Sequence, residues 1–187
     1  MTADRKKVFV VYGRNKLVRR QIFAFLKLLG LSPIAWEEAV WATQRMAPYN
    51  KQIIDTLLSQ AQAVVVLLTG DDEVRLQQEL ASRDELAENS RLQPRLNVIF
   101  EAGMAFSNPW LADKTILVEI GDIDICKSLQ GRHRIKLSNN IADRWNLFRS
   151  LKEAGCEVET PDLDKLRRIG DFNFTEMMLY QMEAEQG

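Results

Sequence analysis

Apolar residues along the chain form short unbroken runs that alternate with helically spaced sets. Val8–Tyr12 and Val64–Leu68 are unbroken and rich in β-branched residues, which is typical of strands buried on both faces of a parallel sheet. Thr115–Ile120 has a similar pattern. Shorter strands are predicted over Ser32–Trp36 and His133–Leu137. The pattern therefore predicts a sheet of about five strands.

Helically spaced apolar residues lie between most of these runs. After the turn Gly13–Asn15 we expect a helix that ends at about Leu29, with the Asn15 side chain as its N-cap. Further helices are predicted after Asn50, over Leu96–Ser107 and after Asn140. Such alternation predicts an α/β domain whose mostly parallel central sheet carries helices on both faces.

Three stretches do not fit this alternation. Glu37–Tyr49 is irregular, and Glu73–Gln93 is charged, partly helical in propensity and long for a connection inside a compact domain. Residues 158–187 combine a charged connector with a predicted amphipathic helix over Thr175–Ala184. We therefore expect one main domain over residues 7–157, with the C-terminal part outside it as a candidate link to a sensor module.

Composition narrows the classes of function. The 25 lysines and arginines nearly balance 26 acidic residues, so the net charge of −1 provides no general attraction to nucleic acid or anionic lipid. Two cysteines and one histidine are too few for a disulfide framework or a histidine-rich metal site. We expect no metal site, no signal peptide and no membrane span, and a reducing, cytoplasmic location.

Glu101 is the most informative single position. It is the only charged residue between Arg95 and Asp113, on a helix whose apolar sequence predicts extensive burial. A carboxylate in such a place must be paired, neutralised or directed into a cleft. Asn97 lies one turn earlier on the same face, and Gly103 leaves room for a ligand or another backbone. The pattern alone also allows a bland alternative, in which Glu101 occupies the one exposed stripe of a buried helix.

Weaker candidates lie in the loops expected at the carboxyl ends of the strands, where open parallel sheets bind ligands. They are Gly13 and Arg14 after the first strand, Trp36 after the second, and Asp71 and Asp72 after the central one. Each has a structural alternative, since adjacent acids often form a turn and a tryptophan often packs in the core. The sequence contains neither GxGxxG nor GxxxxGK[ST], which argues against a Rossmann dinucleotide site and a P-loop.

Several segments together resemble the bacterial TIR-like domains of anti-phage effectors, such as the TIR halves of bacterial STING proteins and of Pycsar effectors. They are Val8–Arg14, Leu67–Asp72 and Arg95–Gly103, with support from Ile34–Glu37 and Leu129–Leu137. The resemblance covers about residues 7–157. It implies a flavodoxin-like TIR fold.

The resemblance also implies an activity, cleavage of NAD+ between nicotinamide and ribose, in which NAD+ is the substrate and no cofactor is needed. Glu101 would be the essential catalytic residue, stabilising the positive charge that develops on the ribose. The implied substrate-binding residues are Gly13, Arg14, Trp36, Asp71, Asp72, Arg95 and Asn97. Assembly into a homo-oligomer or filament would use Glu37–Tyr49, and a cyclic-nucleotide-sensing module or partner would supply the signal.

Two other functions remain open at this point. A non-catalytic TIR scaffold would signal only by self-association and would have no use for Glu101. An enzyme similar to nucleoside deoxyribosyltransferases would share the sheet order but would use the glutamate as a nucleophile. Release of a free base from deoxynucleosides, instead of nicotinamide from NAD+, would favour that enzyme.

Overall fold

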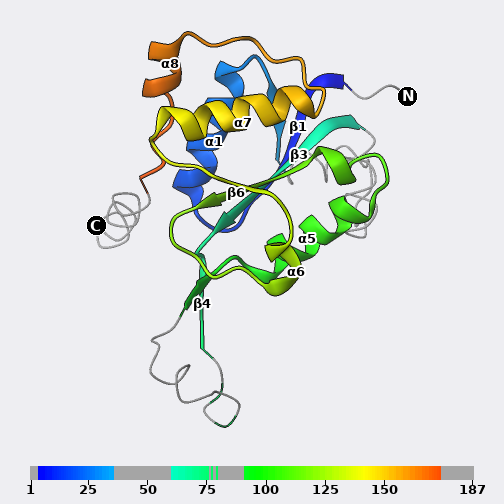
Figure 1. Cartoon of the computed structure of the whole chain (residues 1–187), viewed down its shortest axis with the longest axis vertical. Coiled ribbons are helices and arrows are strands. Elements are labelled where there is room, and N and C mark those ends of the chain that lie inside the picture. Colours follow the sequence, from blue (N-terminus) through cyan, green and yellow to red (C-terminus); the bar gives the residue numbers. More distant parts are fainter. Residues whose placement is uncertain (1–3, 36–59, 76, 78, 80–90, 174–187) are drawn as a thin grey trace, which may run out of the picture.

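The computed structural model describes residues 4–35, 60–75, 77, 79 and 91–173 of the 187-residue chain (Figure 1). The predicted helix after Asn50, the Glu37–Tyr49 stretch, Trp36 and the predicted helix over Thr175–Ala184 lie outside these residues. The elements are β1 (Asp4–Val11), α1 (Lys16–Leu28), β2 (Ser32–Ile34), β3 (Ala61–Thr69), β4 (Asp72–Val74), β5 (Arg91–Gln93), α5 (Leu96–Ser107), the 3-10 helix η1 (Ala112–Lys114), β6 (Thr115–Ile120), α6 (Lys127–Gln130), β7 (Arg134–Lys136), α7 (Ile141–Glu153) and α8 (Leu163–Arg168).

The central sheet has five strands in the order β2-β1-β3-β6-β7, and every neighbouring pair is parallel. The predicted α/β class and strand number are therefore confirmed. β3 lies in the middle, and all nine of its residues are buried. A strand buried on both faces must be covered by helices on both sides, because no part of its surface can face water.

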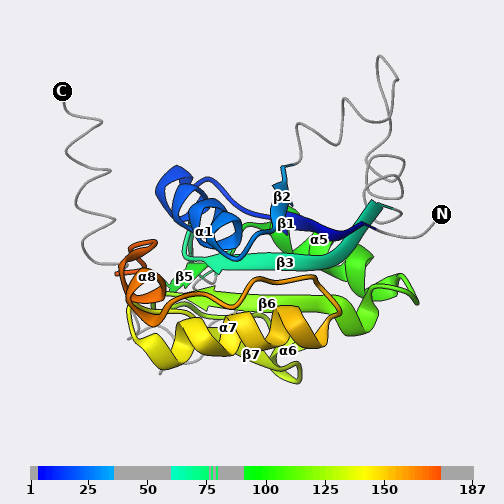
Figure 2. The ribbon, with the colours of Figure 1, turned by 90° about the horizontal axis from the view of Figure 1, so that it is seen from above.

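Alternate residues of the strands point to two separate layers of helices. Val8 and Val10 pack in the core beneath α1 and α7, whereas Phe9 and Val11 pack in the core beneath α5. Figure 1 shows α1 and α7 above the strands with α5 and α6 below them, and in the view of Figure 2 β3 runs between α1 and α7. The unbroken apolar runs in the sequence thus supply both cores at once.

The ends of α1 and α7 follow the predicted capping pattern. The Asn15 side chain accepts a hydrogen bond from the Val18 N–H at 3.0 Å, and the Asn140 side chain accepts one from the Ala142 N–H at 2.9 Å. These bonds satisfy N–H groups that the first helical turn leaves without a backbone partner.

The two ends of the Glu73–Gln93 segment, whose composition favours helix only in part, form strands. β4 and β5 pair antiparallel, with Val74 opposite Arg91, and form a separate two-stranded arm that extends away from the sheet (Figure 1). The base of the arm is held by tertiary contacts, because the Asp124 N–H donates to the Leu92 carbonyl at 2.8 Å. Local helix propensity could not reveal a strand that depends on a residue 32 positions away.

The chain continues to pack on the fold beyond residue 157. Leu166 and Phe172 are buried in the same core as α1 and α7, and the Phe172 ring makes an edge contact with Phe25 at 6.0 Å between centroids. The division expected after residue 157 therefore does not mark the end of the packed structure. We call residues 158–173 the C-terminal strap.

Arg144 on α7 holds this strap in place. Its guanidinium donates to the carbonyls of Leu166 at 2.8 Å and Gly170 at 2.6 Å, and also to the carbonyl of Ile169. It lies 5.1 Å from the centre of the Phe172 ring and is only 1% exposed. Burial lowers the Arg144 pKa, but the carbonyl oxygens compensate the buried charge with hydrogen bonds.

We expect Arg144→Leu to lower the free energy of unfolding by about 2–4 kcal/mol, because several buried carbonyls lose their donor. Arg149→Leu is the matched control, since Arg149 is an exposed residue of the same helix. Chemical denaturation followed by circular dichroism would measure both values. Equal stability of the two variants would show that the strap does not depend on Arg144.

Candidate active site

The carboxyl ends of β1 and β3 lie side by side at one edge of the sheet. The two strands are parallel and in register as far as the pair Val11 and Val66. The turn Gly13–Arg14 follows β1 at this edge, and Gly70–Asp71 follows β3. This is the edge at which open parallel α/β sheets bind ligands.

The Asp71 carboxylate connects these two loops. One oxygen accepts a hydrogen bond from the Thr69 hydroxyl at 2.9 Å, and the other accepts one from the Arg14 backbone N–H at 2.6 Å. Asp72, in contrast, belongs to β4 and pairs with Gln93 in the arm. The two acids predicted as one rim of a pocket therefore have different surroundings.

Helix α5 begins near the same edge and carries Glu101. Leu92, four residues before the helix, packs against Gly70 at the end of β3, where an added Cβ would lie 2.8 Å from the Leu92 Cβ. Glu101 is the sixth residue of α5, which places it about 7.5 Å along the helix at a rise of 1.5 Å per residue. Val98 and Ala102 on the same helix are buried against the sheet.

The Glu101 carboxyl is half-buried and has no compensating partner among the described residues. Its pKa is raised to about 7, because burial disfavours the charged form. An ordinary buried acid is paired or hydrogen-bonded. Glu101 instead retains a carboxyl group that titrates near neutral pH, and such groups are concentrated at functional sites.

The exposed side of α5 was not predicted. Leu96 is 82% exposed and Phe100 is 63% exposed, so the helix is not largely buried as its apolar sequence suggested. Gly103 lies on this exposed side with open space around it. The helix packs on the sheet along one side only, and Glu101 is half-buried at the border between the packed side and the exposed stripe.

The other predicted residues near Glu101 lie farther out. Asn97 is exposed. Among the described residues, the Asn97 side chain makes no hydrogen bond to Glu101, either directly or through a third residue. Arg95 is half-buried at the N-cap of α5, where it makes no side-chain capping bond. Trp36 lies outside the described residues.

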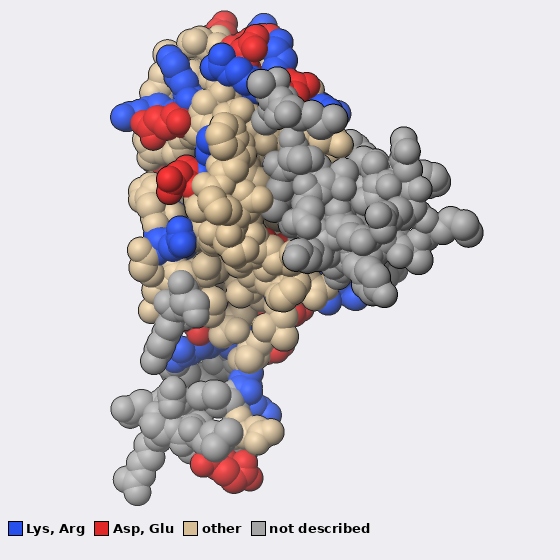
Figure 3. Space-filling view, turned by 90° about the vertical axis from the view of Figure 1, so that its right-hand side faces the viewer, with Lys and Arg blue, Asp and Glu red and all other residues tan. Residues whose placement is uncertain are grey.

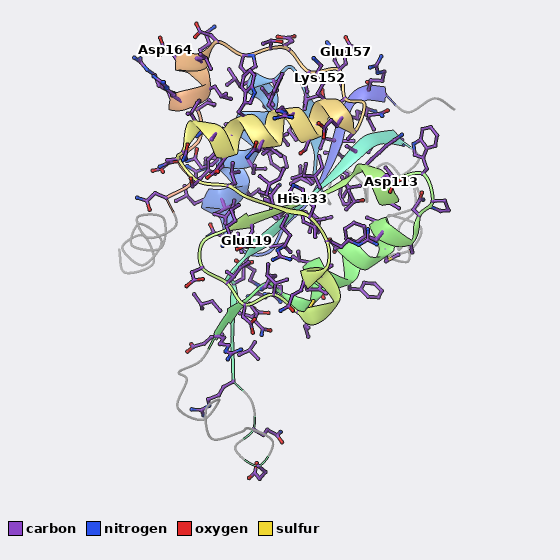
Figure 4. The ribbon with its side chains drawn as sticks, in the orientation of Figure 1. Asp113, Glu119, His133, Lys152, Glu157 and Asp164 are labelled. Atoms are coloured by element: carbon purple, nitrogen blue, oxygen red, sulfur yellow. The ribbon has the colours of Figure 1, made fainter. Side chains whose placement is uncertain are left out.

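Other reactive side chains do not form a competing site in the described part of the chain. No three histidine, cysteine, aspartate or glutamate residues within residues 4–35, 60–75, 77, 79 and 91–173 are grouped closely enough to hold a metal ion. His133 is exposed on the connection that leads into β7 (Figure 4). Cys156 is buried, and burial raises its pKa to about 11, which keeps the thiol protonated and unreactive.

A hollow of about 860 Å³ that the sequence did not reveal lies beyond the carboxyl ends of β6 and β7. Glu119, which Figure 4 labels on β6, lines it but is already paired with Arg134 at 3.2 Å and Lys136 at 3.5 Å. Asp143, also in its wall, accepts from the Ser138 hydroxyl at 2.6 Å. These polar groups serve the fold, so the hollow offers a weaker case for ligand binding than the edge beside Glu101.

The face of the described structure in Figure 3 is mostly uncharged, and its charged side chains are of both signs. Basic and acidic side chains lie next to each other at its upper end. This mixture agrees with the net charge of −1. Within the described ranges, no helix combines the length and the apolar character that crossing a bilayer requires.

Comparison with known proteins identifies the family. Residues 7–139, well over half of the chain, match the family described as "CAP12/Pycsar effector protein, TIR domain". "Protein tirC" of Dictyostelium discoideum is 33% identical over 104 residues, which cover 54% of this chain and 46% of that protein. The match therefore spans about half the length of this curated relative. Together with the five-stranded parallel sheet, the family match confirms the resemblance in the sequence, and the chain belongs to the TIR-domain family of CAP12 and Pycsar effector proteins.

Proposed function

We propose that this TIR domain cleaves NAD+ between nicotinamide and ribose, with Glu101 as its catalytic residue. The observation that carries the proposal is the half-buried Glu101 carboxyl, which has no described protein partner and a pKa raised to about 7. It lies on the helix that starts at the ligand-binding edge of the sheet. The match to a family of TIR effectors supports this assignment.

The chemistry needs little more than one well-placed carboxylate. The bond between C1′ of the ribose and the pyridinium nitrogen breaks, and its electron pair neutralises the nitrogen, so nicotinamide leaves without a general acid. Positive charge develops on the ribose, as in glycoside hydrolysis. A water molecule then adds to C1′ and releases a proton, which gives ADP-ribose. A carboxylate in a partly desolvated site stabilises the cationic transition state more than it would in water.

Other residues at the edge would bind the rest of the dinucleotide. The Arg14 side chain is exposed beside Gly13, and a guanidinium there suits the pyrophosphate. Arg95, at the start of α5, and Asn97 would contact the substrate from the other side, and Asp72 would approach it from the base of the arm. Trp36 remains the candidate for stacking on a ring.

In the cell we propose that NAD+ depletion is the toxic output of an anti-phage defence system in the cytoplasm. The family description, which names Pycsar effectors, supports control by a cyclic-nucleotide-sensing module or partner. We further propose that a second copy of the chain completes the active state through Glu37–Tyr49. Its Trp41 and Met46 are residue types that protein interfaces favour.

We expect Glu101→Gln to reduce nicotinamide release from NAD+ by at least about 100-fold, because the amide keeps the shape of the side chain but cannot stabilise the cation. Glu153→Gln, at an exposed position of α7, is the matched control and should retain full activity. Chromatographic detection of nicotinamide would measure both. Substantial activity of Glu101→Gln at equal concentration would exclude the proposed role, and base release from deoxynucleosides would indicate the alternative enzyme.

We also expect kcat/KM to rise with pH and to level off above an apparent pKa of about 7. The folded protein holds Glu101 protonated below that value, and only the charged form stabilises the ribosyl cation. Initial rates measured between about pH 5 and pH 9 at one fixed ionic strength would define this dependence of kcat/KM on pH. Activity that is constant or falls across this interval would contradict the assignment.

Activity per molecule should increase steeply with protein concentration, because the isolated domain would be nearly inactive before copies associate. A wide dilution series, read by nicotinamide release and by light scattering, would show whether activity and assembly rise together. Activity per molecule that stays constant on dilution would mean that one copy contains the whole active site.

A further inference from the structure

We infer that Asp71 is a positioning residue for this site and not a substrate ligand. Its carboxylate fixes the Gly13–Arg14 turn to the end of β3 and thereby holds the Arg14 side chain at the ligand-binding edge. The part of this inference that concerns turnover rests on the proposed NAD+ cleavage, whereas the part that concerns the turn does not.

Both carboxylate oxygens of Asp71 are engaged by the protein itself. One accepts from the Thr69 hydroxyl at 2.9 Å and the other from the Arg14 backbone N–H at 2.6 Å. The Asp71 N–H also donates to the Thr69 carbonyl at 2.9 Å, which folds the chain back immediately after β3. A charged acceptor at 2.6 Å is a strong partner for a backbone N–H, so the turn after β1 is held by a residue 57 positions away.

The absence of a side chain at Gly13 is a further feature of the same contact. A Cβ built on Gly13 would lie 1.6 Å from the Oδ2 atom of Asp71 and 2.8 Å from its Cγ. Gly13 is not among the described glycines with positive φ, so its backbone conformation does not require glycine. Position 13 lacks a side chain because the carboxylate occupies that space on its way to the Arg14 N–H.

The contact connects two parts of the site. Arg14 is followed by Asn15, whose side chain caps α1 at the Val18 N–H. On the other side, Gly70 allows close contact with Leu92, which leads into α5 and Glu101. The three residues Thr69–Asp71 thus join the turn that carries Arg14 to the segment that precedes the catalytic helix.

The inference predicts different effects for two substitutions of the same residue. Asp71→Ala removes both acceptors. Asp71→Asn can retain both bonds, because the amide oxygen can accept from the Arg14 N–H while the amide N–H donates to the Thr69 hydroxyl, which accepts as well as donates. A substrate ligand that acts through its negative charge would lose as much in Asp71→Asn as in Asp71→Ala.

The experiment measures two properties of each variant in the full chain. Hydrogen exchange at the Arg14 amide, followed by NMR, reports the turn whether or not NAD+ is the substrate. Steady-state kinetics of nicotinamide release report kcat and KM. Asp113→Ala, at an exposed position on η1, is the matched control that should behave as wild type in both.

We expect Asp71→Ala to abolish protection of the Arg14 amide and to lower kcat/KM by about 10- to 100-fold, as misplacement of binding groups does. Asp71→Asn should keep the protection and most of the kcat/KM. Gly13→Ala should reproduce the Asp71→Ala effects, and combining it with Asp71→Ala should add no further loss, because both act on one contact.

Three results separate the possible failures. Unchanged Arg14 protection in Asp71→Ala, or equal loss of kcat/KM in Asp71→Asn and Asp71→Ala, would overturn the positioning role. If Asp71→Ala does not fold, loss of Arg14 protection in the folded Asp71→Asn variant would overturn it, and retained protection would support it. Absence of nicotinamide release by wild type, with the expected exchange results, would refute the proposed function and leave the role of Asp71 in the turn supported.

Discussion

The complete burial of β3 is the constraint on which the rest of the structure depends. All nine residues of this central strand are buried, so α1 and α7 must cover one face of the sheet and α5 the other. Polar backbone and side-chain groups are therefore concentrated at the edge where β1 and β3 end. Chemistry is possible at this edge because the chain leaves the apolar core there and because two loops, held together by Asp71, meet.

Two ionisable groups in the structure differ in how their burial is compensated. Arg144 is 1% exposed, yet carbonyls of the C-terminal strap and the Asn139 side chain accept hydrogen bonds from its guanidinium. Glu101 is half-buried on α5 and has no such acceptor or donor among the described residues. Hydrogen bonds offset much of the cost of burying a charge, so that removing them destabilises the fold, whereas an uncompensated buried charge costs stability and is a candidate for another use.

The same contrast separates the acids at or near the carboxyl ends of the strands. Asp71 has both oxygens occupied by Thr69 and Arg14, and Glu119 is paired with two basic side chains. These carboxylates hold loops and strands in place. The catalytic proposal therefore concentrates on Glu101, while the neighbouring loops provide the geometry that a substrate would meet. In the proposed site, the group that would stabilise the transition state is separate from the groups that would position the substrate.

The sequence by itself determined the five strands of the central sheet, their alternation with helices, the caps Asn15 and Asn140, and the isolation of Glu101, because these depend on local periodicity and residue type. Only the tertiary structure decided that Arg144 binds the C-terminal strap, that β4 and β5 form an arm, and that Asp71 reaches the Arg14 backbone. Each of these contacts joins residues that are far apart in sequence, at separations from 17 to 57 residues in the pairs Val74–Arg91, Arg144–Leu166 and Arg14–Asp71. Their hydrogen-bond partners are mostly backbone groups, which carry no residue-specific pattern, so no local sequence signal could announce them.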